Sequence, residues 1–289
     1  GTPSAIGGLL HGDGQSIAGG IFLNKSVSRN LGINMASAYS LLPSAKYFSN
    51  LFIPSIAFAS TSINGLNNGT YYQKINNFED QKAFILDTDN VRKVNTKDTN
   101  IPLKGNSALY DIAEKVHGFL DSIYWGNAIN YWSIVGWNKL TTKTIEYLNK
   151  DCRNCKGYTF KNQKTNLGDG TVVSGSADYD SKNTAYIDLD AVSESENRNI
   201  EHSNILGASS TISMIDGLIK NSDSEKVKNV VEQNDAISFD KPLEYNSKSY
   251  LIVSTHSPVD LHVYDSKGRH SGISNNIDSA DIEDGISPL

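Results

Sequence analysis

The most informative stretch of the sequence is Asn166-Leu167-Gly168-Asp169-Gly170-Thr171-Val172-Val173. An aspartate between two glycines predicts a turn in which the backbone can adopt positive φ and the carboxylate projects freely. Strand candidates lie on both sides of this turn, and open α/β sheets carry their functional loops in such places. Asp169 is therefore a candidate catalytic acid. An ordinary surface turn and part of a calcium loop are the alternatives.

A histidine follows Asp169 in the segment Glu201-His202-Ser203-Asn204, after the last strand candidate of this region and before a predicted helix. An acid and then a histidine, each after a late strand, is the order found in α/β hydrolases, in which the nucleophile precedes both. His202 is therefore the candidate base. A surface histidine at the start of a helix is the alternative.

The apolar pattern predicts an α/β fold class for most of the chain. Helices are expected at 34–42, 78–86, 107–125 and 204–220, and strands at 131–136, 143–148, 157–161 and 186–189. Tight loops are expected in the glycine-rich first 25 residues, and a polar linker or lid loop at 87–106. Apolar residues of the two longer helices recur every three or four positions and are expected to face inward: Leu109, Ile112, Val116, Phe119, Leu120 and Ile123, then Ile205, Ile212, Ile215, Leu218 and Ile219.

The chain changes character after Asn221. Residues 222–234 are charged and predict a solvated helix or a linker, and strands are expected at 250–253 and 259–263, with a hairpin turn at 266–268. The sequence therefore predicts a first domain over 1–230 and a truncated, sandwich-like β-rich module over 231–289. This module is expected to bind, space or anchor. Acidic turns in it could hold calcium, but such turns are usually solvated, so no metal site is predicted there: Asp260, Asp265, Asp278, Asp281 and Asp284.

Composition excludes several classes of protein. The 289 residues carry a net charge of −6, which argues against nucleic acid as the main partner because phosphate binding needs clustered Lys and Arg. Apolar residues make up 38% and charged residues 20%, and the 30 Asn and 35 Ser supply many polar, uncharged side chains for the surface and loops. The longest apolar run, 51–59, is broken by Pro54 and is far shorter than the roughly 20 residues of a transmembrane helix.

Two cysteines are too few for a disulfide framework or a four-cysteine zinc site. Cys152 and Cys155 are expected to form a short-loop disulfide in an exported protein, and two free thiols are the main alternative. No cofactor is implied. His117 lies beside an apolar stripe and is expected to be structural, whereas His11 could line a site or belong to a loop.

Gly168–Val172 together with Glu201-His202 closely resembles the acid and histidine segments of lipases and acyltransferases related to lecithin:cholesterol acyltransferase. Gly1-Thr2-Pro3 resembles the strand end that follows the nucleophile helix in those enzymes. Residues 34–48 resemble part of their cap, and 131–137 the strand that re-enters the sheet. The resemblance covers roughly residues 1–220. It implies an α/β-hydrolase fold with a helical cap at about 4–125.

The resemblance also implies a Ser-Asp-His triad in which Asp169 and His202 are the acid and the base. The family's nucleophile lies in a Gly-x-Ser-x-Gly motif before the Gly-Thr-Pro triplet, and the chain contains no such motif. The nearest imitation surrounds Ser16, which is assigned to a cap loop. The chain is therefore expected to be a piece of a longer polypeptide whose upstream part holds the serine, and to be inactive alone.

The parent protein is expected to hydrolyse lipid or other carboxylic esters, or to transfer their acyl groups. The apolar residues of 21–75 would then line an acyl channel or form the cap's own core. Secretion or a cell-surface location is expected, with contact to a cell surface or polymer through the β-rich module. The competing class is a non-catalytic cell-surface binding or structural protein that reuses the hydrolase scaffold.

Overall fold

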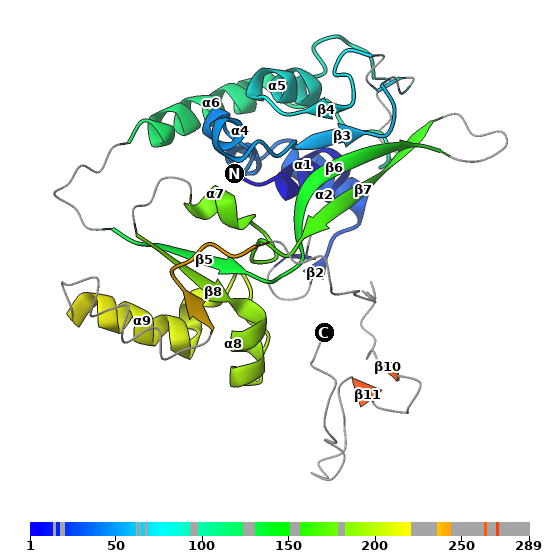
Figure 1. Cartoon of the computed structure of the whole chain (residues 1–289). Coiled ribbons are helices and arrows are strands. Elements are labelled where there is room, and N and C mark those ends of the chain that lie inside the picture. The colour runs from blue at the N-terminus through cyan, green and yellow to red at the C-terminus, as the bar shows by residue number, and fades with distance from the viewer. Residues whose placement is uncertain are drawn as a thin grey trace.

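The computed structural model has a mixed α/β architecture in which helices pack around two mixed sheets (Figure 1). It describes residues 1–13, 16–17, 21–61, 63, 65–66, 69–92, 98–123, 131–150, 157–178, 183–220, 236–243, 263–264 and 270–271. The helices are α1 (Ser4–His11), α2 (Lys25–Gly32), α3 (Ala36–Ser40), α4 (Ala45–Leu51), α5 (Phe78–Leu86), α6 (Ser107–Asp121), α7 (Ser174–Asp178), α8 (Leu189–Glu196), the 3-10 turn η1 (Ile205–Gly207) and α9 (Ser209–Lys220). The strands are β1 (Ser16–Ile17), β2 (Ile21–Phe22), β3 (Ile56–Phe58), β4 (Lys74–Ile75), β5 (Ser133–Trp137), β6 (Thr141–Asn149), β7 (Tyr158–Thr165), β8 (Thr184–Asp188), β9 (Ile237–Ser238), β10 (Val263–Tyr264) and β11 (His270–Ser271).

The first sheet has the strand order β4-β3-β6-β7. β3 runs parallel to β6, while β4 and β7 are antiparallel to their neighbours. Ile6 of α1, Ile56 of β3 and Ile145 of β6 are fully buried in one core. The segment expected to be a helical cap therefore contributes two strands to a sheet that it shares with the later chain, and it is not purely helical.

The glycine-rich start of the chain forms helix α1, where tight loops were expected. Gly7 and Gly8 are buried within this helix, and a Cβ on Gly7 would lie 3.4 Å from Cδ1 of Ile145. The small residues let α1 lie close against β6, so close packing against the sheet outweighs the low helix propensity of glycine. Gly12 ends the helix in the left-handed conformation, with φ of 71°.

The second sheet has the order β5-β8-β9, with β5 and β8 parallel and β9 antiparallel to β8. Figure 1 shows α8 and α9 on one side of this sheet and α7 on the other. Ile187 of β8, Val192 of α8 and Met214 of α9 are buried in a second core. Because residues 237–238 pair with β8, they belong to this sheet and not to a separate module that begins at 231.

Helices and strands are confirmed close to the predicted positions, and α5 coincides with the expected 78–86. The orientation predicted for the two longer helices is partly wrong. α6 buries Tyr110 and Ala113, whereas four residues of its predicted inward face are exposed: Ile112, Val116, Phe119 and Leu120. Ile212 and Ile219 of α9 are exposed in the same way. Periodicity marks an apolar face but does not show whether the rest of the described chain covers it.

Towards the C-terminus, β10 and β11 pair antiparallel, as the predicted hairpin around 266–268 requires. The expected strand at 250–253, the charged segment 222–234, both cysteines and the five acidic turn residues lie outside the described residues. The sandwich-like module remains a prediction. Across the part of the chain that the structure describes, no helix is both long and apolar enough to cross a lipid bilayer.

His11 is a fully buried structural residue at the end of α1 and does not line a site. Its Nδ1 lies 2.8 Å from the carbonyl oxygen of Thr99, its Nε2 lies 2.7 Å from the hydroxyl of Tyr147, and its ring stacks on Phe160. Burial lowers the pKa of His11 from 6.5 to about 3, because the charged imidazolium would lose its hydration. The ring is therefore neutral in the folded protein.

Burial of His11 predicts a loss of stability in mild acid. Between pH 6.5 and about 3 the unfolded histidine binds a proton that the folded one does not, so its contribution to stability falls as the pH falls. The slope approaches ~1.4 kcal/mol per pH unit. Urea unfolding of wild type and His11→Gln at about pH 7 and about pH 5 is expected to show a smaller acid-induced loss in the variant.

Tyr147→Phe is the matched control, because it removes the partner of Nε2 but leaves the ring buried. This variant is expected to be less stable at both pH values and to keep the wild-type pH dependence. Equal acid-induced losses in wild type and His11→Gln would contradict the prediction.

Candidate active site

The side chains of Asp169 and His202 are in direct contact. Nδ1 of His202 lies 2.8 Å from Oδ2 of Asp169. The backbone N–H of His202 also donates to the carbonyl oxygen of Asp169, at 2.9 Å. The structure thus brings together the two residues singled out in the sequence.

The turn around Asp169 holds its carboxylate in one orientation. Oδ1 accepts hydrogen bonds from the backbone N–H groups of Thr171 (3.0 Å) and Val172 (2.7 Å). Gly170 has φ of 93°, and its N–H donates to Oγ1 of Thr141 at 2.8 Å. With Oδ1 held by the turn, Oδ2 is the oxygen that contacts His202.

The Asp169 turn lies beside the carboxyl end of β5. Asp169 forms a parallel bridge with Lys139, whose N–H donates to the carbonyl oxygen of Gly168 at 3.0 Å. The chain therefore leaves the second sheet after β5, forms the hairpin of β6 and β7 in the first sheet, and returns at the Asp169 turn to the β5 edge of the second sheet. Ligand sites in open α/β sheets lie at the carboxyl ends of strands, which is where this turn is placed.

Two glycines allow the strands to approach the turn. A Cβ on Gly136 of β5 would lie 2.8 Å from the Cβ of Asp169 and 2.8 Å from Cδ1 of Leu189. A Cβ on Gly168 would lie 2.3 Å from Oγ1 of Thr141. A side chain at either position would displace the acid, so both positions require glycine.

His202 reaches the site from the far end of α8. The sequence placed His202 directly after the last strand, but α8 intervenes between β8 and the histidine. Asp188 caps α8 by accepting the N–H groups of Asp190 and Ala191, each at 3.0 Å. This cap starts a helix immediately after β8. An aspartate at this position is a sequence signal for the start of a helix, and the prediction that His202 directly follows the strand did not take it into account.

The pair is arranged for proton transfer at Nε2. A carboxylate only accepts hydrogen bonds, so the proton of a neutral imidazole lies on Nδ1 and the lone pair on Nε2. No described residue hydrogen-bonds to Nε2, and the His202 side chain is 50% exposed while that of Asp169 is 12% exposed. The ring can therefore accept a proton from a hydroxyl group that approaches Nε2.

The first residues of the chain pack against the Asp169 turn. The hydroxyl of Thr2 donates to the carbonyl oxygen of Thr171 at 2.7 Å, and the hydroxyl of Ser4 donates to the same oxygen at 3.2 Å. The hydroxyl of Ser176 donates to the carbonyl oxygen of Gly1 at 2.7 Å. Gly1 therefore lies at the edge of the site, a placement that nothing in the local sequence around residue 170 indicates.

The other candidate residues lie outside this arrangement. His117 bonds through Nε2 to the carbonyl oxygen of Ser40 at 2.8 Å, in keeping with the structural role expected for it. Ser16 belongs to β1, although a loop was expected at this position. Within the described ranges, no group of three or more His, Cys, Asp or Glu residues could hold a metal ion.

Comparison of the chain with protein-family models, curated proteins and solved structures finds no match. Inferences about chemistry at the site therefore rest on its geometry and on the motifs around Asp169 and His202.

The contact at Gly136 predicts a selective loss of stability. Gly136→Ala is expected to lower the free energy of unfolding by ~1–3 kcal/mol, because its methyl group would overlap Asp169 and Leu189. Gly207→Ala is the matched control, since a Cβ there meets nothing within 4 Å. Urea unfolding of the three proteins checks the prediction, and equal stability of Gly136→Ala and wild type would contradict it.

Proposed function

We propose that this chain carries the acid and the base of a serine hydrolase or acyltransferase that acts on carboxylic esters. The observation that supports the proposal is the 2.8 Å contact between Nδ1 of His202 and Oδ2 of Asp169. The His202 side chain is half exposed, and Nε2 has no partner among the described residues. An acid that orients a histidine in this way is the base-and-orienter arrangement of nucleophilic catalysis.

In this mechanism, Nε2 of His202 accepts the proton of a serine hydroxyl as its oxygen attacks the ester carbonyl carbon. Asp169 holds the ring in the required tautomer and stabilises the imidazolium that forms. His202 then gives the proton to the leaving alkoxide as the carbon–oxygen bond breaks, which leaves an acyl-serine. Water or an acceptor alcohol repeats the cycle on the acyl group, and the serine hydroxyl is restored.

The nucleophile is proposed to lie in a segment that precedes Gly1, together with the backbone donors of the oxyanion hole. The contacts of Thr2 and Ser4 with Thr171 of the Asp169 turn, and of Gly1 with Ser176, support this placement, because a preceding segment would join the chain at the edge of the site. Ser16 is the alternative nucleophile within the chain.

We further propose an α/β-hydrolase fold related to the lipases and acyltransferases that the Gly168–Val172 motif resembles. The parallel pair of β5 and β8 supports it, as does the acid at the carboxyl end of β5. Lipid esters are the proposed substrates, and secretion or a cell-surface location is proposed with them. The 231–289 module is proposed to contact a cell surface or polymer.

The proposal predicts that esterase activity depends on both residues. In the polypeptide that includes the residues preceding Gly1, His202→Ala and Asp169→Asn are each expected to lower kcat by about 10⁴-fold or more, because the serine loses its oriented base. Hydrolysis of nitrophenyl esters measures kcat, and labelling by a fluorophosphonate probe reports the reactivity of the serine.

His117→Ala is the control, because it removes a histidine that contacts Ser40 and lies outside the Asp169–His202 arrangement. Near wild-type turnover in either His202→Ala or Asp169→Asn would exclude the Asp169–His202 triad. Absence of turnover and labelling in the unsubstituted longer polypeptide would favour the non-catalytic binding protein. The 289-residue chain alone is expected to show neither turnover nor labelling. Activity of this chain that Ser16→Ala removes would place the nucleophile at Ser16.

A further inference from the structure

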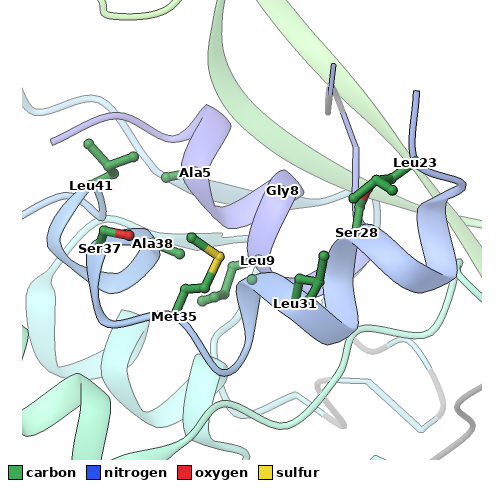
Figure 2. A pocket seen from close by; sticks show the side chains of 11 residues that line it. Ala5, Gly8, Leu9, Leu23, Ser28, Leu31, Met35, Ser37, Ala38 and Leu41 are labelled. Atoms are coloured by element: carbon green, nitrogen blue, oxygen red, sulfur yellow. The ribbon is translucent and has the colours of Figure 1, made fainter. Parts of the chain in front are cut away.

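A cavity of about 370 Å³ lies between α1, α2 and α3 (Figure 2). Its wall includes the side chains of Leu9, Leu23, Leu31, Met35 and Leu41. The cavity lies on the face of α1 opposite to the one that packs on β6. Leu9 belongs both to the wall and to the main core, whereas neither Asp169 nor His202 lines the cavity.

Among the described residues that line the cavity none is charged, and the polar side chains are the hydroxyls of Ser28 and Ser37. Ser28 is buried, and its hydroxyl has no hydrogen-bond partner among the described residues. Leu31, Met35 and Leu41 are about half exposed, so the cavity is open to solvent on one side, and a charged group inside it would gain no partner from the wall. The chemistry of the wall therefore selects an uncharged, apolar occupant.

The volume limits the size of that occupant. Small-molecule sites typically have volumes of roughly 300–1,000 Å³, and this cavity lies near the lower end of that range. Its elongated wall runs from Ala5 and Leu41 at one end to Leu23 and Ser28 at the other (Figure 2). The dimensions suit one alkyl chain and not the two chains of a diacyl lipid.

Hydrogen bonds link one end of the cavity to the turn of the candidate active site. Leu41 accepts the backbone N–H of Thr2 at 2.8 Å, and the hydroxyls of Thr2 and Ser4 both contact the carbonyl oxygen of Thr171. Thr171 in turn donates its N–H to the Asp169 carboxylate. Three consecutive hydrogen bonds thus connect Leu41, at the Ala5 end of the cavity, to the acid.

We propose that this cavity binds the single acyl chain of the ester, with its carbonyl end at Ala5 and its methyl end towards Ser28. The inference rests on the proposed function for the direction of the chain. Binding of the chain itself requires only residues of this polypeptide, so it can be tested without the nucleophile.

Gly32→Leu is the variant that tests the site. Gly32 lines the cavity, and a Cβ there would lie 3.8 Å from Gly8 and Leu9, at ordinary contact distance, so the larger side chain enters the cavity without backbone overlap. Gly118→Leu is the matched control, because it makes the same change in helix α6, where a Cβ meets nothing within 4 Å.

Displacement of the fluorescent fatty acid cis-parinaric acid from the 289-residue chain by palmitate and by methyl palmitate measures binding. Wild type and Gly118→Leu are expected to bind both compounds. Gly32→Leu is expected to weaken both by about tenfold or more, because the added side chain removes space for part of the chain. Equal binding by Gly32→Leu and wild type, or no binding by wild type, would overturn the proposal.

The two ligands separate recognition of the chain from recognition of a carboxylate. Similar affinities support the uncharged cavity, whereas binding of palmitate alone would overturn it. Ser28→Ala is expected to bind as tightly as wild type or more tightly, and weaker binding would exclude a plain alkyl chain.

His202→Ala distinguishes this inference from the proposed function. The variant is expected to keep full binding in the displacement assay, because His202 does not line the cavity. Two results together would reject the triad and leave the cavity assignment intact: Gly32→Leu weakens binding of the alkyl chain, and ester hydrolysis does not depend on His202.

Discussion

The arrangement of the candidate site depends on how one carboxylate divides its two oxygens. Oδ1 of Asp169 accepts the N–H groups of Thr171 and Val172, and Oδ2 contacts Nδ1 of His202. The first oxygen closes the turn and the second orients the ring. Folding of the turn and orientation of the histidine therefore both depend on the Asp169 side chain. Hydrogen bonds from backbone N–H groups hold this side chain in one orientation and offset the loss of its conformational entropy.

The turn also joins the two parts of the described fold. The first sheet and α1 enclose one core, while β5, β8, α8 and α9 enclose another. The Asp169 turn follows β7 of the first sheet and bridges to Lys139 at the end of β5. Close contacts at Gly136 and Gly168 leave no room for a side chain at this junction. Hydrogen bonds of Thr2 with Leu41 and Thr171 link the apolar cavity to the same junction, so the proposed acyl chain and the proposed catalytic pair share one framework.

Local sequence was sufficient for the parts of the fold that local chemistry decides. The Gly-Asp-Gly turn, the helix at 78–86 and the strands at β5, β6 and β8 follow from residue type and periodicity, and the order of Asp169 and His202 predicted their contact. Tertiary packing decided the rest. The glycines near the N-terminus predicted loops, but they form α1, because their small size lets this helix pack closely against β6. Ile112 and Phe119 are exposed, although their spacing predicted burial. The cavity arises between three helices. The apolar residues of 21–75, which the sequence offered for an acyl channel, include Leu31, Met35 and Leu41 of its wall, whereas the part of the wall that α1 supplies was not predicted.

The backbone bond between His202 and Asp169 separates the architecture of the site from its chemistry. The N–H of residue 202 reaches the carbonyl oxygen of residue 169 whatever side chain residue 202 carries. A single substitution of the histidine would thus remove the proposed base and leave the turn and the junction in place. In the proposed enzyme, such a variant would bind its ester without hydrolysing it. One codon would then separate the proposed enzyme from a receptor for the same molecule.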